Sequence, residues 1–241
     1  MKDYFNKVYN KGEKNFYKML EDNLINNIKT FIITSNPETF IMGKKDIDFD
    51  KVIMDTNTIL TADGVGISVG AKILSYKGIE KITGVDISVK LLEYANKNKK
   101  SIYLYGSRQE VIDELIKVIN KEYPNIEIKG FKNGYSKDKD KDFMEIIKLE
   151  PDIVLVALGM GNQEKLIYKH LDKFKNGIFV GVGGTFDVLS GTKKRAPKVF
   201  QKLGLEWLYR IVKEPKRIKR FYDNNVKFMF KLFINKDKWK N

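Results

Sequence analysis

From residue 101 onward, short β-rich apolar runs alternate with segments of helical hydrophobic spacing. Ser101 to Tyr105 predicts a strand that ends at Gly106-Ser107, and Gln109 to about Glu122 predicts the helix that follows. Further strands are predicted at 126–129, 152–158 and 177–182, and further helices at 138–149 and 164–174. This alternation, with glycine or polar turns at the strand ends, is typical of βαβ units and of a parallel sheet covered on both faces.

The first hundred residues show the same pattern less clearly. Phe31-Ile32-Ile33 predicts a strand that runs into Thr34, and Thr58 to Leu60 predicts another that runs into Ala62-Asp63-Gly64. We therefore expect an α/β fold over residues 1–192, with a Rossmann-like, mostly parallel sheet and helices on both faces. A basic, amphipathic helical appendage is expected over residues 193–241.

Positive charge separates these two regions. The chain of 241 residues has a formal net charge of +14, from 45 lysines and arginines and 31 acidic residues. Residues 193–241 hold 16 of these basic residues and four acids, a net charge of +12, which leaves 29 basic and 27 acidic residues, or +2, for residues 1–192. The charge thus indicates a local surface on a nearly neutral body, and it favours a polyanionic partner.

The end of the chain predicts an amphipathic helix. After Glu214-Pro215, residues 216–234 place apolar side chains on one side and cationic or polar side chains on another. The apolar set is Ile218, Phe221, Tyr222, Val226, Met229, Phe230 and Phe233, and the polar set is Arg217, Arg220, Asn224, Lys227 and Lys231. Such a helix is typical of an anionic membrane interface. A helix packed on the body with solvated lysines is the alternative, and we expect no nucleic-acid partner because no nucleic-acid-binding fold accompanies the charge.

The segment Met1 to Lys7 is charged and unlike a signal peptide. No apolar run approaches the roughly 18 residues that cross a bilayer. We therefore expect a cytoplasmic protein, peripheral on the inner face of the cell membrane. With no cysteine and the single His170, thiolate sites and histidine clusters are excluded. D-x-D triplets at Asp46 to Asp50 and Asp138 to Asp142 lie among lysines, and we expect neither a metal nor another cofactor.

Five glycine or polar loops follow predicted strands, where open α/β sheets bind ligands. They are Thr34-Ser35-Asn36, Ala62-Asp63-Gly64, Gly106-Ser107, Gly159 to Gln163 and Gly183 to Asp187. Asp63 is the candidate general base, since it lies at a strand end between small residues. Its alternative role is the N-cap of a helix that starts near Val65. Gln163 and Glu164 could bind a ligand or cap the next helix.

Several motifs occur in a fixed order along the chain. They are Thr34-x-Asn36, Ala62-Asp63-Gly64, Thr83-Gly84-Val85-Asp86, Tyr103-Leu104-Tyr105-Gly106, Gly134-Tyr135, Gly159-x-Gly161-x-Gln163-Glu164-Lys165, Gly181 to Asp187, Lys194-Arg195-Ala196-Pro197, Leu203 to Arg210 and Glu214-Pro215-Lys216-Arg217-x-x-Arg220. From about Thr34 to Tyr222, this ordered set resembles the WecG/TagA/CpsF glycosyltransferase family.

The resemblance implies an inverting, metal-independent transferase. It would move a sugar, typically N-acetylmannosamine, from UDP to GlcNAc-diphospho-undecaprenol at the cytoplasmic membrane face, as in the teichoic acid linkage unit. The family's base falls on Asp63. The resemblance places the family's donor-sugar pocket on Thr34, Asn36 and Gln163. It places the uridine contacts near Tyr135 and Asp187, with the glycine loop Gly183-Gly184. It places the diphosphate and membrane contacts on Arg210, Arg217 and Arg220.

Two departures from the family pattern concern this pocket. Lys81 stands where relatives commonly carry arginine, which keeps the charge of a substrate-binding position but loses bidentate phosphate geometry. Gly161-Asn162 replaces the usual Pro-Lys or Pro-Arg.

Other activities remain open at this point. The same family includes enzymes whose UDP-sugar donors carry N-acetylmannosamine uronic acid or glucose. A nicotinamide-dependent Rossmann oxidoreductase and a non-catalytic lipid-binding module are alternatives from other classes. A homo-oligomer is also left open.

Overall fold

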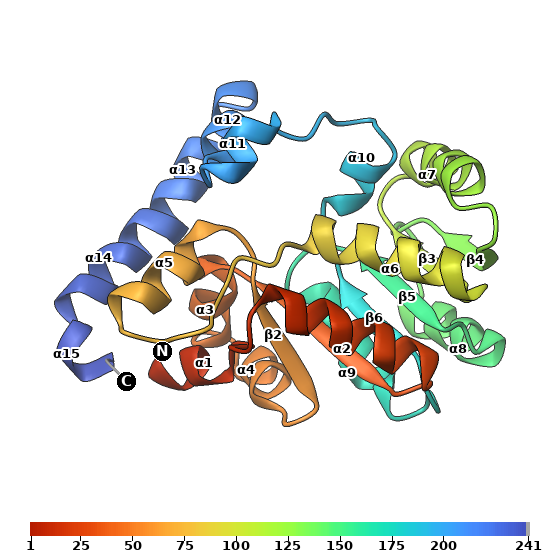
Figure 1. Ribbon diagram of the computed structural model, residues 1–241, viewed down its shortest axis with the longest axis horizontal. Helices are drawn as coiled ribbons and strands as arrows, with labels where there is room; N and C mark the ends of the chain where they lie inside the picture. Colours follow the sequence, from red (N-terminus) through yellow and green to blue (C-terminus); the bar gives the residue numbers. More distant parts are fainter. Residues whose placement is uncertain (240–241) are drawn as a thin grey trace.

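A six-stranded, fully parallel sheet forms the centre of the computed structural model, in which residues 1–239 are described (Figure 1). The strands are β1 (Thr30–Ser35), β2 (Thr58–Ala62), β3 (Ser101–Gly106), β4 (Glu127–Lys132), β5 (Ile153–Ala157) and β6 (Ile178–Gly181). They lie in the order β2-β1-β6-β5-β3-β4. The predicted α/β class and parallel sheet are therefore confirmed.

Helices cover both faces, because successive residues of the buried strands point to opposite sides. Ile32 and Leu155 face one core, and Phe31 and Val154 face the other. The first face carries α2 (Glu13–Ile25), α6 (Gly84–Asn98), α7 (Gln109–Glu122) and α10 (Thr185–Leu189). The second carries α1 (Lys2–Lys7), α3 (Pro37–Gly43), α4 (Ile47–Met54), α5 (Val65–Ile73), α8 (Lys139–Leu149) and α9 (Asn162–Leu171).

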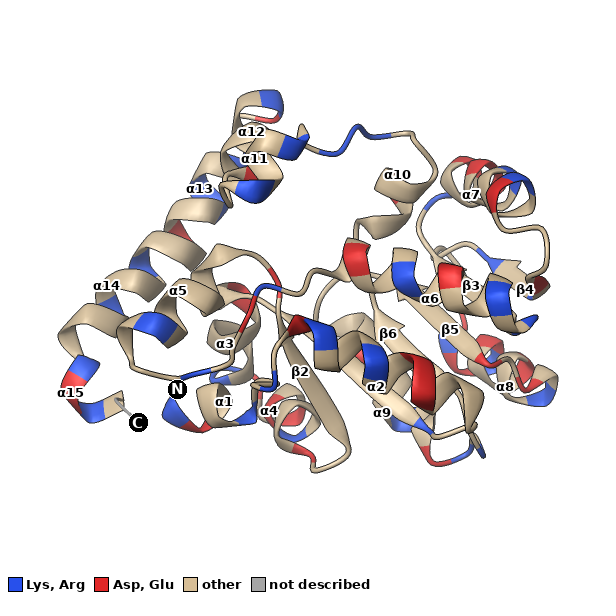
Figure 2. Ribbon diagram, in the orientation of Figure 1, with Lys and Arg blue, Asp and Glu red and all other residues tan. Residues whose placement is uncertain are grey.

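Residues 193–239 form the tail, an arm of short helices beside α5 and α3 (Figure 1). Its elements are α11 (Lys198–Lys202), α12 (Glu206–Lys213), α13 (Arg217–Phe221), the π-helical η1 (Tyr222–Val226), α14 (Lys227–Ile234) and α15 (Lys236–Trp239). Lysine and arginine recur along it (Figure 2). The predicted helix at 216–234 is thus present, with one π-helical turn inside it.

The tail packs on the body through a face that the sequence pattern did not identify. Phe228 and Leu232 are buried; Phe228 lies 6.3 Å from Phe5 between ring centroids, and Leu232 lies against Gly70. Met229, which belongs to the apolar set defined from the sequence, is partly buried against this core. The alternative, a helix packed on the body, is therefore confirmed for this face.

A second apolar stripe of the tail stays exposed. It comprises Ile218, Tyr222, Val226, Phe230, Phe233 and Ile234, each at least 42% exposed. Spacing of three or four residues places these side chains on one side of the arm. Within residues 1–239, no helix is both long enough and apolar enough to cross a bilayer.

Candidate active site

The carboxyl ends of β1, β5 and β6 meet at the middle of the sheet, where strand order reverses and α/β folds bind ligands. The Thr34 hydroxyl, at the end of β1, donates to the carbonyl of Gly181 at 3.2 Å. The side-chain oxygen of Gln163, on α9, accepts from the N–H of Gly183 at 3.1 Å. Three loops that carry predicted site residues are thus brought together.

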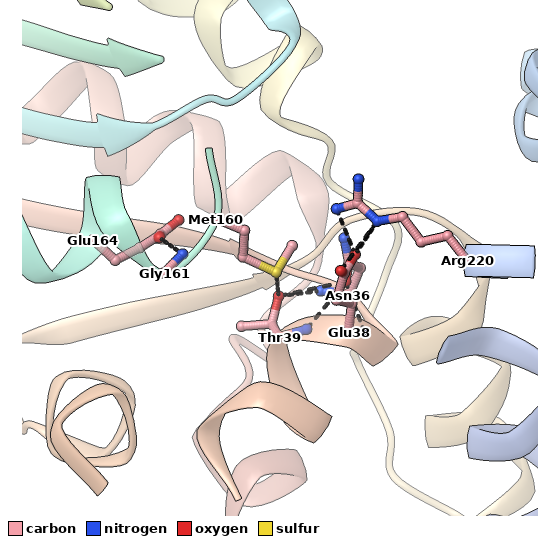
Figure 3. Close-up of polar contacts among 7 residues, drawn as sticks. All are labelled: Asn36, Glu38, Thr39, Met160, Gly161, Glu164 and Arg220. Carbon is pink, nitrogen blue, oxygen red and sulfur yellow. Dashed lines mark hydrogen bonds and ion pairs between the residues drawn. The ribbon is translucent and has the colours of Figure 1, made fainter. Parts of the chain in front are cut away.

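Gln163 is held in this position by Glu164. Gln163 is 3% exposed, and its Nε2 donates to Glu164 Oε1 at 2.7 Å. The other oxygen of Glu164 accepts from the N–H of Gly161 at 2.6 Å (Figure 3). Burial raises the pKa of Glu164. Glu164 therefore fixes both the glycine loop and the Gln163 amide.

Gly161 has φ +84°, a conformation that proline, with φ near −65°, cannot adopt. A Cβ at this position would lie 2.5 Å from the terminal carbon of Met42. Proline at this position would therefore require a different local backbone.

Asn36 lies next to the loop of Asp63. The N–H of Asp63 donates to the carbonyl of Ser35 at 2.7 Å, which continues the pairing of β1 and β2. Asn36 caps α3, since its Oδ1 accepts from the N–H groups of Glu38 at 2.9 Å and Thr39 at 3.2 Å. Its Nδ2 is the part of the side chain that could contact a ligand.

Asp63 follows β2 directly, and its side chain is half-buried. The N-cap of α5 is Gly64, at φ +80°, and no side chain caps that helix. The alternative role of Asp63 as an N-cap is therefore wrong.

The surroundings of Asp63 raise the pKa of its carboxyl group toward neutral pH. Burial, with smaller contributions from Glu206 and Asp86, raises the pKa of Asp63 to about 6, against the opposing effects of Arg210 and the Gly84 N–H. A carboxylate with a pKa near the working pH suits general base catalysis.

Lys81 and Arg210 lie on either side of one tail carboxylate. Lys81 is paired in a parallel bridge with Ala62, and its Nζ donates to the carbonyl of Gln201 at 3.1 Å. The same nitrogen lies 3.6 Å from Glu206, which is also 3.9 Å from Arg210. The structure thus brings the tail to the edge of the sheet where Asp63 lies.

The residues predicted near the nucleotide lie around the loop after β3. The N–H of Gly134, next to the 74% exposed Tyr135, donates to the Ser107 carbonyl at 2.9 Å. Arg108 lies 3.8 Å from Asp187 on α10. A shallow cavity of about 560 Å³ adjoins this region, lined in part by Gly134, Leu158 and Asn162 and by the lysines Lys139, Lys165 and Lys169.

Gly183 and Gly184 precede α10. Gly183 has φ +50°, and no atom lies within 4 Å of the place where its Cβ would be. Glycine therefore leaves open space beside the Gly183 backbone.

Arg217 and Arg220 take different partners. Arg217 pairs with Glu214 at 2.7 Å, within the tail. Arg220 reaches from α13 to Glu38 at the start of α3 (Figure 3). Arg210, Arg217 and Arg220 are therefore spread along the arm, from the Asp63 loop to α3.

The two D-x-D triplets serve local structure. Asp46 and Asp138 cap α4 and α8, and Asp140 contacts Lys169 and the buried His170. Among residues 1–239, no three or more Asp, Glu or His side chains are grouped so that they could hold a metal ion.

Four charged residues at the site were not assigned a role from the sequence: Glu38, Asp86, Arg108 and Glu206. Asp86 and Glu206 lie within the family motifs, and Arg108 follows one of the glycine loops. Their contacts join residues far apart in the chain, so hydrophobic periodicity carries no signal for them.

The parallel sheet, the glycine loops at its carboxyl edge and the half-buried carboxylate define a Rossmann-like α/β enzyme. The chain belongs to the WecG/TagA/CpsF family of glycosyltransferases, because residues 6–241 match the sequence model of the family described as "Glycosyl transferase WecG/TagA/CpsF family". The resemblance inferred from the motifs is thereby confirmed.

Two similar proteins carry the name N-acetylglucosaminyldiphosphoundecaprenol N-acetyl-beta-D-mannosaminyltransferase. That of Bacillus subtilis (strain 168) is 39% identical over 212 residues, which is 88% of this chain and 82% of the relative. That of Staphylococcus aureus (strain MW2) is 32% identical over 228 residues, which is 90% of this chain and 89% of the relative.

Proposed function

We propose that this chain transfers N-acetylmannosamine from UDP to GlcNAc-diphospho-undecaprenol, as the names of its relatives indicate for them. The observation that carries the proposal is Asp63, a half-buried carboxylate with a pKa of about 6 at the carboxyl edge of the sheet. A nicotinamide-dependent oxidoreductase is not supported, since the family and its named relatives are glycosyltransferases.

In the proposed reaction, Asp63 takes the proton of the acceptor hydroxyl as that oxygen attacks the anomeric carbon of the donor. The bond from the anomeric carbon to the β-phosphate oxygen breaks, and its electron pair leaves with UDP. Attack from the face opposite UDP inverts the anomeric centre. A positioned base contributes typically ~10²–10⁴-fold to such a step.

The donor would lie over the ends of β1, β5 and β6. Thr34, Asn36, Gln163 and Lys81 are proposed contacts of the sugar and its phosphates. Tyr135, Asp187 and the loop Gly183-Gly184 are proposed contacts of the uridine. Tyr135 is exposed enough to stack on a base.

The leaving diphosphate needs cations or fixed donors in place of a metal ion. We propose that Arg210, Arg217 and Arg220 supply this charge, so that the reaction needs no metal and no other cofactor. This role suits arginine, because its planar guanidinium binds two phosphate oxygens at once.

Residues 193–241 are proposed as the membrane-docking part of the chain, with residues 1–192 as the catalytic part. The exposed stripe of the tail would enter the lipid interface, and its lysines would face anionic headgroups at about 1 kcal/mol for each cation near the surface. The protein would then act at the cytoplasmic face, where it meets the lipid-linked acceptor.

The test is incubation with a panel of UDP-sugars and a GlcNAc-diphospho-lipid, followed by mass analysis. We expect a product larger by one N-acetylhexosamine unit, formed from UDP-N-acetylmannosamine and not from the uronic acid or glucose donors. Asp63→Asn should bind UDP and form no product. Transfer at the normal rate by Asp63→Asn would exclude Asp63 as the base.

A further inference from the structure

Glu206, the first residue of α12, is a tail carboxylate beside the loop of Asp63, and its side chain is only 16% exposed. Three cations surround it: Lys81 at 3.6 Å, Arg195 at 3.7 Å and Arg210 at 3.9 Å. These cations come from the edge of the sheet, from the segment between α10 and α11, and from α12. One carboxylate therefore joins three separate segments at the site.

Asp86 completes this charge cluster. Arg195 lies 2.8 Å from Asp86, and the Thr83 hydroxyl donates to Asp86 at 2.6 Å. Although burial opposes it, these two contacts lower the pKa of Asp86. With Asp63 ionised, the cluster holds three carboxylates against the three cations.

Steric contacts show how closely the tail covers the Asp63 loop. Gly204, at φ +71°, lies so near Val65 that a Cβ on Gly204 would be 2.3 Å from Val65 Cγ1. Val65 begins α5, two residues after Asp63. The start of α12 therefore lies against the loop of the proposed base.

We propose that Glu206 is a positioning residue that holds α12 over Asp63 and places Arg210 beside it. Glu206 does so by pairing with Lys81 and Arg195, which belong to neither α12 nor the Asp63 loop. This inference rests on the proposed function, in which Asp63 is the base.

The charges around Asp63 determine what loss of Glu206 does. Burial, Glu206 and Asp86 oppose ionisation of Asp63, whereas Arg210 and the Gly84 N–H favour it. Removal of the Glu206 charge takes away one opposing charge, and release of α12 reduces burial, which is the largest effect. The same release withdraws Arg210, whose charge acts in the opposite direction. The titration of Asp63 should therefore change, and Asp63 should lose the cation that Glu206 places beside it.

The test compares Glu206→Gln, Glu206→Asp and the control Asp223→Asn. Asp223 is also a tail carboxylate in an ion pair, with Lys227 at 2.6 Å, and it lies outside the cluster. The pKa of Asp63 is measured by NMR titration of its carboxyl carbon. Docking of α12 is measured as protease resistance of segment 191–197, and activity is measured as kcat and KM across pH.

For Glu206→Gln we expect the Asp63 titration midpoint to shift from its wild-type value by about 0.5 unit or more, with cleavage of segment 191–197. We also expect kcat to fall about tenfold or more, while the KM for the UDP-sugar changes less. Glu206→Asp, which keeps the charge, should recover part of each effect, and Asp223→Asn should match the wild type.

The inference is overturned if Glu206→Gln keeps the wild-type midpoint of Asp63 and the wild-type resistance to protease. These two measurements need no turnover. If the wild-type protein transferred no sugar, the proposed function would fail separately from the docking role of Glu206.

Discussion

Arg220 binds Glu38 through two nitrogens: Nε lies 3.1 Å from both carboxylate oxygens, and Nη2 lies 2.9 Å from Oε2 (Figure 3). Glu38 is two residues along the chain from Asn36, which belongs to the proposed donor pocket. The pair therefore brings Arg220, a proposed phosphate ligand of the tail, to the edge of that pocket, where the Glu38 carboxylate occupies its guanidinium.

This relationship predicts opposite effects of changing its two partners. Glu38→Gln removes the carboxylate that competes with phosphate for Arg220, so affinity for a short-chain GlcNAc-diphospho-lipid should rise severalfold. Arg220→Lys loses the bidentate geometry, so affinity should fall about tenfold. Calorimetry with each variant checks both directions.

Lys219→Ala, a change at the neighbouring exposed lysine, is the control and should stay near the wild-type affinity. Thermal stability should change little in all three variants, because an exposed ion pair contributes about 0–1 kcal/mol. A loss of affinity in both Glu38→Gln and Arg220→Lys would show that the pair acts as a unit instead.

The raised pKa of Asp63 predicts the acid limb of the rate profile. Only the ionised carboxylate can accept a proton, so kcat/KM should rise about tenfold per pH unit below a pKa of about 6 and level off above it. Initial rates at lipid acceptor concentrations well below KM from pH 4.5 to 8 would measure this. A flat profile over that range would contradict a base with this pKa.

The same pKa predicts a pH-dependent cost to stability. The pKa of Asp63 is about 6 in the folded protein against an ordinary value of 3.8, so between these values the folded state binds more protons than the unfolded chain. The free energy of unfolding therefore falls as pH rises through this window. Asp63→Asn removes the cost and should stabilise the protein at pH 7 by on the order of 1–3 kcal/mol.

Thermal unfolding of Asp63→Asn and wild type at pH 4 and pH 7 would measure that difference, which should be larger at pH 7. Asp223→Asn provides the opposite case, because the hydrogen bond from Lys227 lowers the pKa of Asp223. Equal effects of Asp63→Asn at both pH values would show that its carboxyl does not titrate abnormally.

The two apolar faces of the tail predict separable defects. Phe230→Ser combined with Phe233→Ser alters only exposed side chains, so binding to anionic vesicles should be lost while the fold is retained. Phe228→Ser alters a buried ring and should destabilise the protein by about 3–5 kcal/mol.

Vesicle sedimentation and thermal unfolding would distinguish these outcomes. Ile47→Ser removes a side chain that is 73% exposed on α4, outside the tail, and it is the matched control for vesicle binding. If Ile47→Ser weakened binding as much as the tail pair, the tail would not be the membrane contact.

The departure at Gly161 predicts that the family's proline is not tolerated here. Gly161→Pro would require φ near −65° in place of +84°, and it would remove the N–H that donates to the buried Glu164. The expected loss is about 3 kcal/mol or more of unfolding free energy. Chemical denaturation measures it, with Gly159→Ala as a comparison that keeps the N–H.

Most of the sheet could be predicted because strands such as β3, β5 and β6 are short apolar runs ended or closely followed by glycine, a local pattern. The short helices α1, α3 and α4 carry too few turns for a clear period, and α3 is recognisable only through the Asn36 cap. In the tail, the spacing predicted a helix but not its buried face. That face depends on Gly70 and Phe5, which lie far from the tail along the chain.

The candidate base was found from a local signal, its place between small residues after a strand. The contacts that tune it could not be found in this way. Glu206 and Lys81 meet only because the tail folds back onto the body. In the sequence alone, neither residue differs from an ordinary surface charge.

Phe5 contacts both Phe40 and Phe228, so α1 and α14 share one core. During synthesis, this core cannot close until the tail has left the ribosome. We expect the newly made protein to expose apolar surface near α1 up to that moment. Closure of this core and presentation of the exposed apolar stripe of the tail would then coincide.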